Sequence, residues 1–190
     1  MKFLKLSACM LMATMFVNFS YAQKMDSQSD KTVNVGGAPM YPSKNIIENA
    51  VNSKDHTTLV AAVKAAGLVE TLQGPGPFTV FAPTNNAFDM LPKGTVETLL
   101  KPENKARLTG ILTYHVVSGK LDSKALAALI KAGNGNAELK TVAGGKLWAS
   151  MQGNKIVLKD ENGGMTMVTI KNVYQSNGVI HVVDHVLLPK

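Results

Sequence analysis

Cysteine and arginine are nearly absent from this sequence: Cys9 and Arg107 are the single examples of each. Cys9 lies in an N-terminal segment that we expect to be removed, so the mature chain is predicted to be stable without disulfides and to lack a thiolate metal site. Scattered lysines supply almost all of the positive charge, and the formal net charge is +7. Lysine gives diffuse attraction to anionic surfaces, whereas arginine recognises phosphate and guanine with a forked geometry. Sequence-specific binding of nucleic acid is therefore not expected.

Residues 1–22 have the features of a secretory signal peptide. Lys2 and Lys5 give a positive start, an apolar stretch covers residues 6–17, and small residues precede a cleavage site after Ala22. The apolar stretch is too short for a stable membrane span, and no later segment reaches such a length without charges. We therefore expect a secreted or periplasmic protein without a transmembrane segment.

An alternative for the N-terminus is lipidation at Cys9. The residues Leu6-Ser7-Ala8-Cys9 have the composition of a lipidation box. The apolar region mostly follows Cys9 instead of preceding it, so the box lies too early. Cleavage near Ala22 is the interpretation that we favour.

The rest of the chain has the length of one ordinary domain. Residues 23–42 are polar and are broken by Gly36-Gly37 and by two prolines, so we predict a linker or N-terminal arm. Residues 43–189 are predicted to form a single domain. Its first part shows helical periodicity, including a helix near residues 56–66 that Gly67 ends and a short helix over 44–51 capped by Ser43.

From residue 139 onwards the apolar period changes to two. Strands are predicted at about 139–142, 146–152, 155–159, 165–174 and 179–188, with hairpin signals between them. A short strand is also predicted over Tyr114-His115-Val116-Val117. A helical first half and a β-meander second half indicate the α+β class.

The stretch FTVFAPTNNAF, residues 78–88, joins a strand to a helix. Pro83 prevents the strand from continuing as a paired central strand. Thr84 is a good N-cap, because its hydroxyl can accept a hydrogen bond from an early helical N–H. The capping role accounts for these polar residues without any catalytic role.

Three ordered segments give the chain a resemblance to the fasciclin (FAS1) family. GPFTVFAPTNNAF at 76–88 resembles the first family signature, LTGILTYHVVSGKL at 108–121 the central Tyr-His region, and SNGVIHVVDHVLLP at 176–189 the second signature. The resemblance covers about residues 43–189. It implies a FAS1-type β-sandwich or wedge with several helices packed against it.

The resemblance also implies a function. Family members are typically secreted or surface-held proteins of adhesion, matrix contact or host–microbe association, and most have no known catalytic activity. Tyr114 and His115 match the motif linked with adhesion in animal members, and the chain contains no Arg-Gly-Asp tripeptide. On physical grounds we expect this pair, which lies between apolar residues, to be buried and hydrogen-bonded.

The family signatures identify five further residues as structural. These signature residues are Thr84, Asn86, Phe88, His181 and Asp184. The strand before the second signature departs from the family pattern, because Asn172 stands where members often carry aspartate. Both faces of the strand around His181 are apolar, so we predict that this histidine is buried, neutral and bonded to the segment around Tyr114 and His115.

Four histidines raise the possibility of metal or acid–base chemistry: His56, His115, His181 and His185. On one strand, His181 and His185 would lie about 13 Å apart, too far to share a zinc ion. Ser118 follows His115 closely, but no sequence context resembles a nucleophile elbow. We predict no cofactor, no metal site and no enzymatic activity.

The sequence thus predicts a monomeric, exported, non-enzymatic adhesion or binding module of a bacterium. Its expected partners are the extracellular matrix, a cell-surface protein or an envelope polysaccharide. The alternative is a small-ligand or envelope-glycan binding protein or enzyme. A pocket lined by Trp148 and polar groups would favour this alternative, whereas a flat surface with a buried His115 would favour the adhesion module.

Overall fold

A seven-stranded mixed sheet runs through the part of the chain that the computed structural model describes, residues 32–190. Its strands lie in the order β4-β3-β9-β8-β7-β6-β5, and β1 and β2 form a separate two-stranded sheet. Strands β3 and β9 are parallel, and the other neighbours in the large sheet are antiparallel. The strands are β1 (Val33–Val35), β2 (Ala38–Met40), β3 (Phe78–Pro83), β4 (Val116–Ser118), β5 (Asn136–Lys140), β6 (Lys146–Gln152), β7 (Lys155–Lys159), β8 (Met165–Gln175) and β9 (Gly178–Val183).

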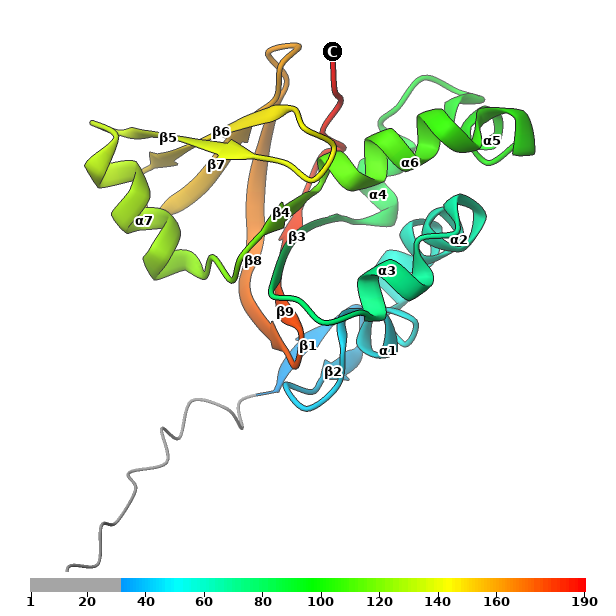
Figure 1. Cartoon of the computed structure of the whole chain (residues 1–190), viewed down its shortest axis with the longest axis horizontal. Helices are drawn as coiled ribbons and strands as arrows, with labels where there is room; N and C mark the ends of the chain where they lie inside the picture. The colour runs from blue at the N-terminus through cyan, green and yellow to red at the C-terminus, as the bar shows by residue number, and fades with distance from the viewer. Residues whose placement is uncertain (1–31) are drawn as a thin grey trace, which may run out of the picture.

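The helices lie on two sides of this sheet (Figure 1). Helices α1 to α6 gather beside β3 and β9, whereas α7 packs against β5 and β6. The helices are α1 (Ile46–Ala50), the 3-10 helix η1 (Lys54–His56), α2 (Thr57–Ala66), α3 (Val69–Gln73), α4 (Asn85–Asp89), α5 (Thr95–Leu99), the 3-10 helix η2 (Pro102–Asn104), α6 (Lys105–Tyr114) and α7 (Ser123–Ala132).

The two edges of the large sheet meet. Val117 of β4 forms an antiparallel bridge with Thr141, just beyond the end of β5. The Val142 N–H donates to the Val116 carbonyl at 2.7 Å. These contacts curl the sheet almost into a barrel and cover edges that would otherwise expose unpaired backbone groups.

Two hydrophobic cores fill the fold. The first lies between helices α1 to α6 and one face of the sheet, and the second lies inside the curled sheet beneath α7. Neighbouring residues of β3 enter different cores: Val80 and Ala82 face the first, whereas Phe81 faces the second. Every residue of β9 is buried, which agrees with the apolar composition of both of its faces.

The structure confirms the predicted α+β class, the helical first half and the β-meander. Strands β6 and β7 have the predicted bounds, and Gly67 ends α2 in the left-handed conformation. Strand β3 ends at Pro83, and α4 begins at Asn85 after its cap, Thr84. These elements have strong local signals, so their bounds could be placed without knowledge of the tertiary contacts.

The predictions at the N-terminal side were less accurate. Helix α1 is capped by Asn45 and not by Ser43, because Asn45 and Glu48 form a reciprocal capping box. Residues 33–40, assigned to a linker or arm, form the hairpin of β1 and β2, and Val35 and Met40 enter the first core. The predicted signal peptide, residues 1–22, lies outside the described residues.

Three strand predictions also need correction. The strand predicted at about 139–142 is β5, which begins at Asn136 and ends at Lys140. Tyr114 does not begin a strand but ends α6, because the apolar spacing of Leu108 and Ile111 continues the helix up to it. The last strand ends at Val183 instead of continuing to residue 188. Beyond it, the backbone of the tail binds side chains of other segments and does not continue the ladder. None of the helices between residues 32 and 190 has the length and apolar character of a membrane span.

Candidate functional site

Tyr114 and His115 lie where α6 ends and β4 begins. Tyr114 points into the second core and has 0% of its surface exposed. Its hydroxyl donates to the Lys146 carbonyl at 2.7 Å and accepts from the Glu161 N–H at 3.1 Å. Burial raises the pKa of Tyr114 to about 12, so the phenol remains protonated. A side chain at Gly145 would come within 2.8 Å of the Tyr114 ring, which explains the glycine in this turn.

His115 is also buried, and both of its ring nitrogens are bonded to backbone groups. Nδ1 lies 2.8 Å from the Ile111 carbonyl, and the Leu187 N–H donates to Nε2 at 3.0 Å. Since Nε2 accepts, the hydrogen of the neutral ring must be on Nδ1. Burial lowers the pKa of His115 to about 4. The ring is therefore neutral at physiological pH and fastens the C-terminal tail to the end of α6.

The turn between β7 and β8 completes this network. The buried carboxylate of Asp160 accepts from the Gly164 N–H at 2.7 Å and from the Leu188 N–H at 3.1 Å. Glu161 accepts from the Lys146 N–H at 3.0 Å. The polar groups around Tyr114 thus bind one another and the tail. The predicted burial and hydrogen bonding of the Tyr-His pair are confirmed, whereas an adhesive role for the pair stays a prediction.

His181 is buried in β9 with 0% of its surface exposed. Its Nε2 lies 2.8 Å from the Leu121 carbonyl, and the Asn172 N–H donates to Nδ1 at 3.4 Å. The ring stacks on Phe81 with centroids 5.8 Å apart. Burial lowers the pKa of His181 and favours its neutral form. The predicted burial is confirmed, but the predicted partner is wrong: His181 holds the loop after β4 and not the Tyr114-His115 pair.

In the first family signature, residues 76–88, Thr84 caps a helix and Asn85 makes hydrogen bonds that the sequence did not predict. Thr84 accepts from the Ala87 N–H at 3.3 Å and so caps α4, and Phe88 lies in the first core. Asn86 is exposed. Its neighbour Asn85, which sequence reasoning missed, accepts from the Thr58 N–H at 3.0 Å and donates to the Lys54 carbonyl at 2.8 Å. The position of Asn85 directly after the cap was the only sequence signal for this role. The role itself could not be predicted, because the bonding partners Thr58 and Lys54 lie 27 and 31 positions away.

Asp184 terminates β9 with its side chain. Its carboxylate accepts from the Met167 N–H at 2.8 Å, where a backbone carbonyl would otherwise continue the ladder. The same oxygen lies 2.9 Å from Nδ1 of the half-exposed His185. The role of Asp184 is thus to end the strand and to hold β8.

The structure offers no support for the catalytic alternatives raised by the sequence. Ser118 is exposed at the end of β4, while both nitrogens of the buried His115 are occupied. His181 is likewise occupied on both sides, so neither histidine can take a proton from a substrate in this arrangement. Over residues 32–190, no three side chains of His, Cys, Asp or Glu come close enough to share a metal ion.

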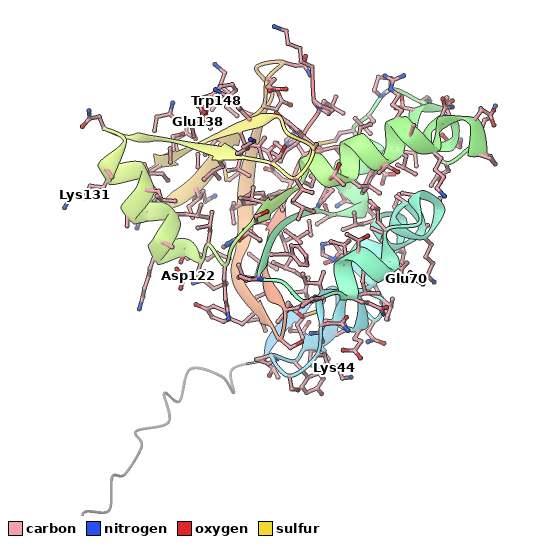
Figure 2. All side chains as sticks on the ribbon, viewed as in Figure 1. Lys44, Glu70, Asp122, Lys131, Glu138 and Trp148 are labelled. Carbon is pink, nitrogen blue, oxygen red and sulfur yellow. The ribbon has the colours of Figure 1, made fainter. Side chains whose placement is uncertain are left out.

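A surface groove surrounds Trp148, on the side of the sheet where Figure 2 labels this residue beside Glu138. The groove has a volume of about 690 Å³. Trp148 lies opposite Glu138 on β5 and opposite Lys159 on β7. Polar residues and two large side chains line the groove. They are Trp148, Lys159 and Met165, Asn136 of β5 and Ser150 of β6, and four residues of the turn between β7 and β8, namely Asp160, Glu161, Asn162 and Gly163.

Polar side chains of this groove are available to a ligand. Asn136, Ser150 and Lys159 make no side-chain hydrogen bond or ion pair to any residue within 32–190, and the Trp148 indole N–H makes none either. The carboxylates of Asp160 and Glu161, in contrast, are already bonded to backbone N–H groups. An aromatic face with an amide, a hydroxyl and a cation around it suits a polar, hydroxylated partner.

Comparison with known proteins gives consistent matches. The family model described as Fasciclin domain matches residues 54–189. Protein sll1483 of Synechocystis sp. is 46% identical over 161 residues, which covers 85% of this chain and 82% of that protein. Transforming growth factor-beta-induced protein ig-h3 of Sus scrofa is 35% identical over 148 residues, which are 78% of this chain but 20% of that protein.

A solved structure shares the fold. It is the FAS1 domain pair of the insect cell adhesion molecule Fasciclin I, with a TM-score of 0.67 and 18% sequence identity. The match covers 76% of this chain and 51% of the insect chain. The family model and the relatives together show that this chain belongs to the fasciclin domain family.

Proposed function

We propose that this chain is an exported, non-enzymatic binding module that acts at the cell surface or in the extracellular matrix. The family resemblance supports this role, as does the fold shared with an insect cell adhesion molecule. Buried histidines that serve as structural ties are consistent with a non-enzymatic role. We further propose that residues 1–22 are removed on export and that residues 43–189, together with the hairpin of β1 and β2, form one monomeric domain.

The observation that carries the binding role is the groove around Trp148. By the criteria set from the sequence, this groove favours a glycan or small ligand as the partner, whereas the buried His115 favours an adhesion module. Tyr114 and His115 are buried, so a partner cannot reach them without opening the fold. The groove offers Trp148, Asn136 and Ser150 at the surface, and its volume of about 690 Å³ is within the range of ligand sites. We therefore place the contact surface on the outer face of β5 to β7.

A second candidate function is the recognition of an envelope glycan in the same groove. The aliphatic ring face of a sugar can stack on the Trp148 indole, while its hydroxyls bond to Asn136 and Ser150. The groove holds one lysine, Lys159, and two carboxylates, Asp160 and Glu161, so its lining suits a neutral hydroxylated sugar better than an anionic one. The net positive charge of the chain would add only weak, general attraction to an anionic polymer. The lining of the groove favours this candidate over a purely apolar protein contact.

The test is a binding screen with the purified exported protein. Immobilised matrix proteins, envelope polysaccharides and whole cells are the probes, and wild type is compared with Trp148→Ala. We expect Trp148→Ala to weaken binding about tenfold or more, because aromatic anchors dominate contact energies. Equal binding of both proteins to a positive probe would exclude the groove as the contact surface.

Two further variants distinguish a loss of contact with the partner from a loss of folding: Met90→Ala is the control, and Asn136→Ala is a second test of the groove. Met90→Ala removes an exposed apolar side chain at the end of α4, outside the lining of the groove, and should leave binding unchanged. Asn136→Ala removes a groove amide at the exposed end of β5 and should weaken binding without lowering the unfolding midpoint. Retention of binding in Asn136→Ala together with loss in Met90→Ala would place the contact elsewhere.

A further inference from the structure

A second surface groove lies between α5, α6 and the C-terminal tail, which are found towards the top of Figure 1. We call it the α5–α6 groove. Its volume is about 500 Å³, which is within the range of ligand sites. It shares no lining residue with the groove around Trp148, so the two grooves are separate surfaces.

The base of the α5–α6 groove is apolar. Leu99 of α5 and Ile111 of α6 are buried members of the first core, and Leu91 and Leu188 are partly buried and pack against that core. The groove therefore opens directly onto core side chains. An aliphatic side chain of a partner that entered it would be removed from water, which is favourable.

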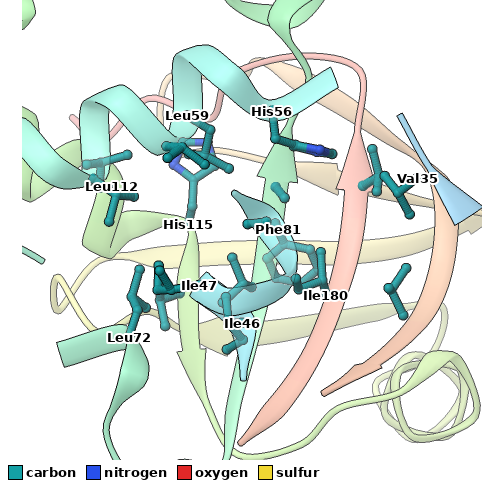
Figure 3. A pocket seen from close by; sticks show the side chains of 18 of the residues that line it. Val35, Ile46, Ile47, His56, Leu59, Leu72, Phe81, Leu112, His115 and Ile180 are labelled. Carbon is teal, nitrogen blue, oxygen red and sulfur yellow. The ribbon is translucent and has the colours of Figure 1, made fainter. Parts of the chain in front are cut away.

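This groove differs from the apolar cavity inside the first core. That cavity has a volume of about 50 Å³, lies between α1, α2 and α3 and strands β3 and β9, and is lined by side chains such as Leu59, Leu72 and Ile180 (Figure 3). It presents almost no polar surface, so it offers no hydrogen bond by which a ligand could be recognised. The α5–α6 groove, in contrast, combines apolar and polar side chains.

Two cations, Lys93 and Arg107, line the α5–α6 groove, and no carboxylate does. Arg107 is the single arginine of the chain and lies one helical turn before Ile111, so the two residues share a face of α6. Both cations are exposed and make no ion pair or side-chain hydrogen bond to any residue within 32–190. Glu97 of α5 and Glu103 of η2 are outside the lining. The positive charge of the groove is therefore available to an anionic partner.

Three uncharged polar side chains also line the groove. The hydroxyls of Thr95 and Thr98 make no hydrogen bond to any residue of the described part of the chain. Asn104 donates its amide N–H to the Thr98 carbonyl at 2.7 Å, which leaves its own oxygen to accept from a partner. A peptide backbone carries donors and acceptors that match these groups, whereas the alkyl chain of a fatty acid would leave them unpaired.

We propose that the α5–α6 groove binds an extended acidic peptide segment of a partner protein. The Arg107 guanidinium takes a carboxylate of the peptide through two parallel N–H···O bonds, and Lys93 adds a second positive charge. An aliphatic side chain two positions from the carboxylate lies on the same side of an extended chain and packs on Leu99 and Ile111. The peptide backbone pairs with the polar side chains of α5 and η2. This site is additional to the groove around Trp148 and does not depend on it.

The probes are two sets of acetylated and amidated pentapeptides, with the patterns Leu-X-Asp-X-Leu and Leu-X-Asn-X-Leu, in which X is alanine, serine or valine. The sets differ in one charge and have the same shape. Their affinities for the full exported chain are measured by NMR titration. We expect the aspartate set to bind about tenfold more tightly, the value of a charge-assisted hydrogen bond. The amide signals of Gly94, Thr95 and Thr98 should shift, and the Trp148 indole signal should not.

A matched pair of double variants tests the two cations. Lys93→Gln/Arg107→Gln removes both charges from the groove and should weaken binding of the aspartate set about tenfold or more, while binding of the asparagine set stays unchanged. Lys101→Gln/Lys105→Gln removes two exposed charges of the same region from outside the lining. This control should stay within about twofold of wild type, because general attraction between exposed charges is screened by salt.

Several outcomes would overturn the proposal. They are equal binding of the two peptide sets by wild type, unchanged affinity in Lys93→Gln/Arg107→Gln, and absence of binding at millimolar peptide concentration. Tighter binding of dodecanoate than of the peptides, with shifts of the same amide signals, would exclude a peptide as the occupant. Trp148→Ala should bind the aspartate set like wild type, so failure here and failure of the Trp148 groove can be told apart.

Discussion

Leu187 donates its backbone N–H to Nε2 of His115 at 3.0 Å, across 72 positions of the sequence. The same ring binds the Ile111 carbonyl on its other side. One neutral imidazole thus joins the end of α6 to the segment that follows β9. The C-terminal tail is held by a core side chain and not by continuation of the sheet.

His115→Ala should destabilise the fold strongly. It removes a buried side chain and leaves the Leu187 N–H without a partner, so we expect a loss of about 2–4 kcal/mol in the free energy of unfolding. Urea denaturation measures this loss, and hydrogen exchange should show that the Leu187 amide loses its protection. The control is His185→Ala, a half-exposed position where the change should stay within about 0.5 kcal/mol. Equal stability of the two variants would contradict the role of His115.

Stability should fall as the pH falls below about 6.5. The pKa of His115 in the folded protein is about 4, lower than its ordinary value of 6.5, and burial also lowers the pKa values of His56 and His181. Between pH 6.5 and 4 the unfolded chain therefore binds more protons than the folded chain, and protonation favours unfolding. The contribution of His115 is on the order of 3 kcal/mol, present in full above pH 6.5. Urea midpoints measured from pH 8 to 4 that stay constant would contradict this assignment.

Structural features that depend on residues close together in the sequence were predicted correctly. Thr84 precedes a helical pattern and lies just after Pro83, so the cap and the start of α4 could be placed correctly. The β-meander followed from alternating apolar residues and glycine turns. The burial of His181 followed from its apolar neighbours on both faces of the strand.

Partners distant in the sequence could not be predicted. The contacts from His115 to Leu187 and from Asn172 to Ser123 span 72 and 49 positions, and they depend on which loops the curled sheet brings together. The same limit explains why His181 was assigned the wrong partner. The groove could be anticipated only through Trp148, because its other walls come from β5, β7 and the following turn.

Thr84→Ala should remove the cap of α4. The hydroxyl accepts from the Ala87 N–H at 3.3 Å, and the substitution removes this bond while the bond from the same N–H to the Thr84 carbonyl remains. We expect a cost of about 0.5–2 kcal/mol, measured as a lower urea midpoint with an unchanged slope. Thr84→Ser, which keeps the oxygen, is the matched control and should cost less. Loss of partner binding in Thr84→Ala at full stability would show that Thr84 has a role beyond capping.

Asn85 and Asn86 are neighbours of the same residue type and should behave differently. Asn85 joins α4 to η1 and α2 through Lys54 and Thr58, whereas Asn86 is exposed. Asn85→Ala should cost about 1–3 kcal/mol, since it leaves backbone groups unsatisfied, and Asn86→Ala should stay within about 0.5 kcal/mol. Thermal unfolding of the two variants measures the difference. A larger loss of stability in Asn86→Ala than in Asn85→Ala would contradict the structural role that we assign to Asn85.

The last prediction concerns Asn172 of β8. Asn172 has a left-handed backbone with φ of 62°, in the irregular part of β8. Its side chain accepts from the Ser123 N–H at 2.7 Å and donates to the Ser123 hydroxyl at 2.8 Å, so it fixes the start of α7. Its backbone N–H donates to Nδ1 of His181. One residue thus connects β8, β9 and α7.

Three substitutions at this position separate its roles, with stability measured by urea denaturation at pH 7. Asn172→Ala loses both hydrogen bonds to Ser123, and alanine tolerates a positive φ less well than asparagine does. We therefore expect the free energy of unfolding to fall by about 2–4 kcal/mol. Asn172→Gly loses the same bonds but tolerates the backbone, and its cost should be smaller by about 1 kcal/mol. Asn172→Asp should be the mildest, because the Ser123 hydroxyl can turn to donate to the carboxylate. The order alanine, glycine, aspartate from most to least damaging is the expected result. An Asn172→Asp variant less stable than Asn172→Ala would show that this site requires the amide itself.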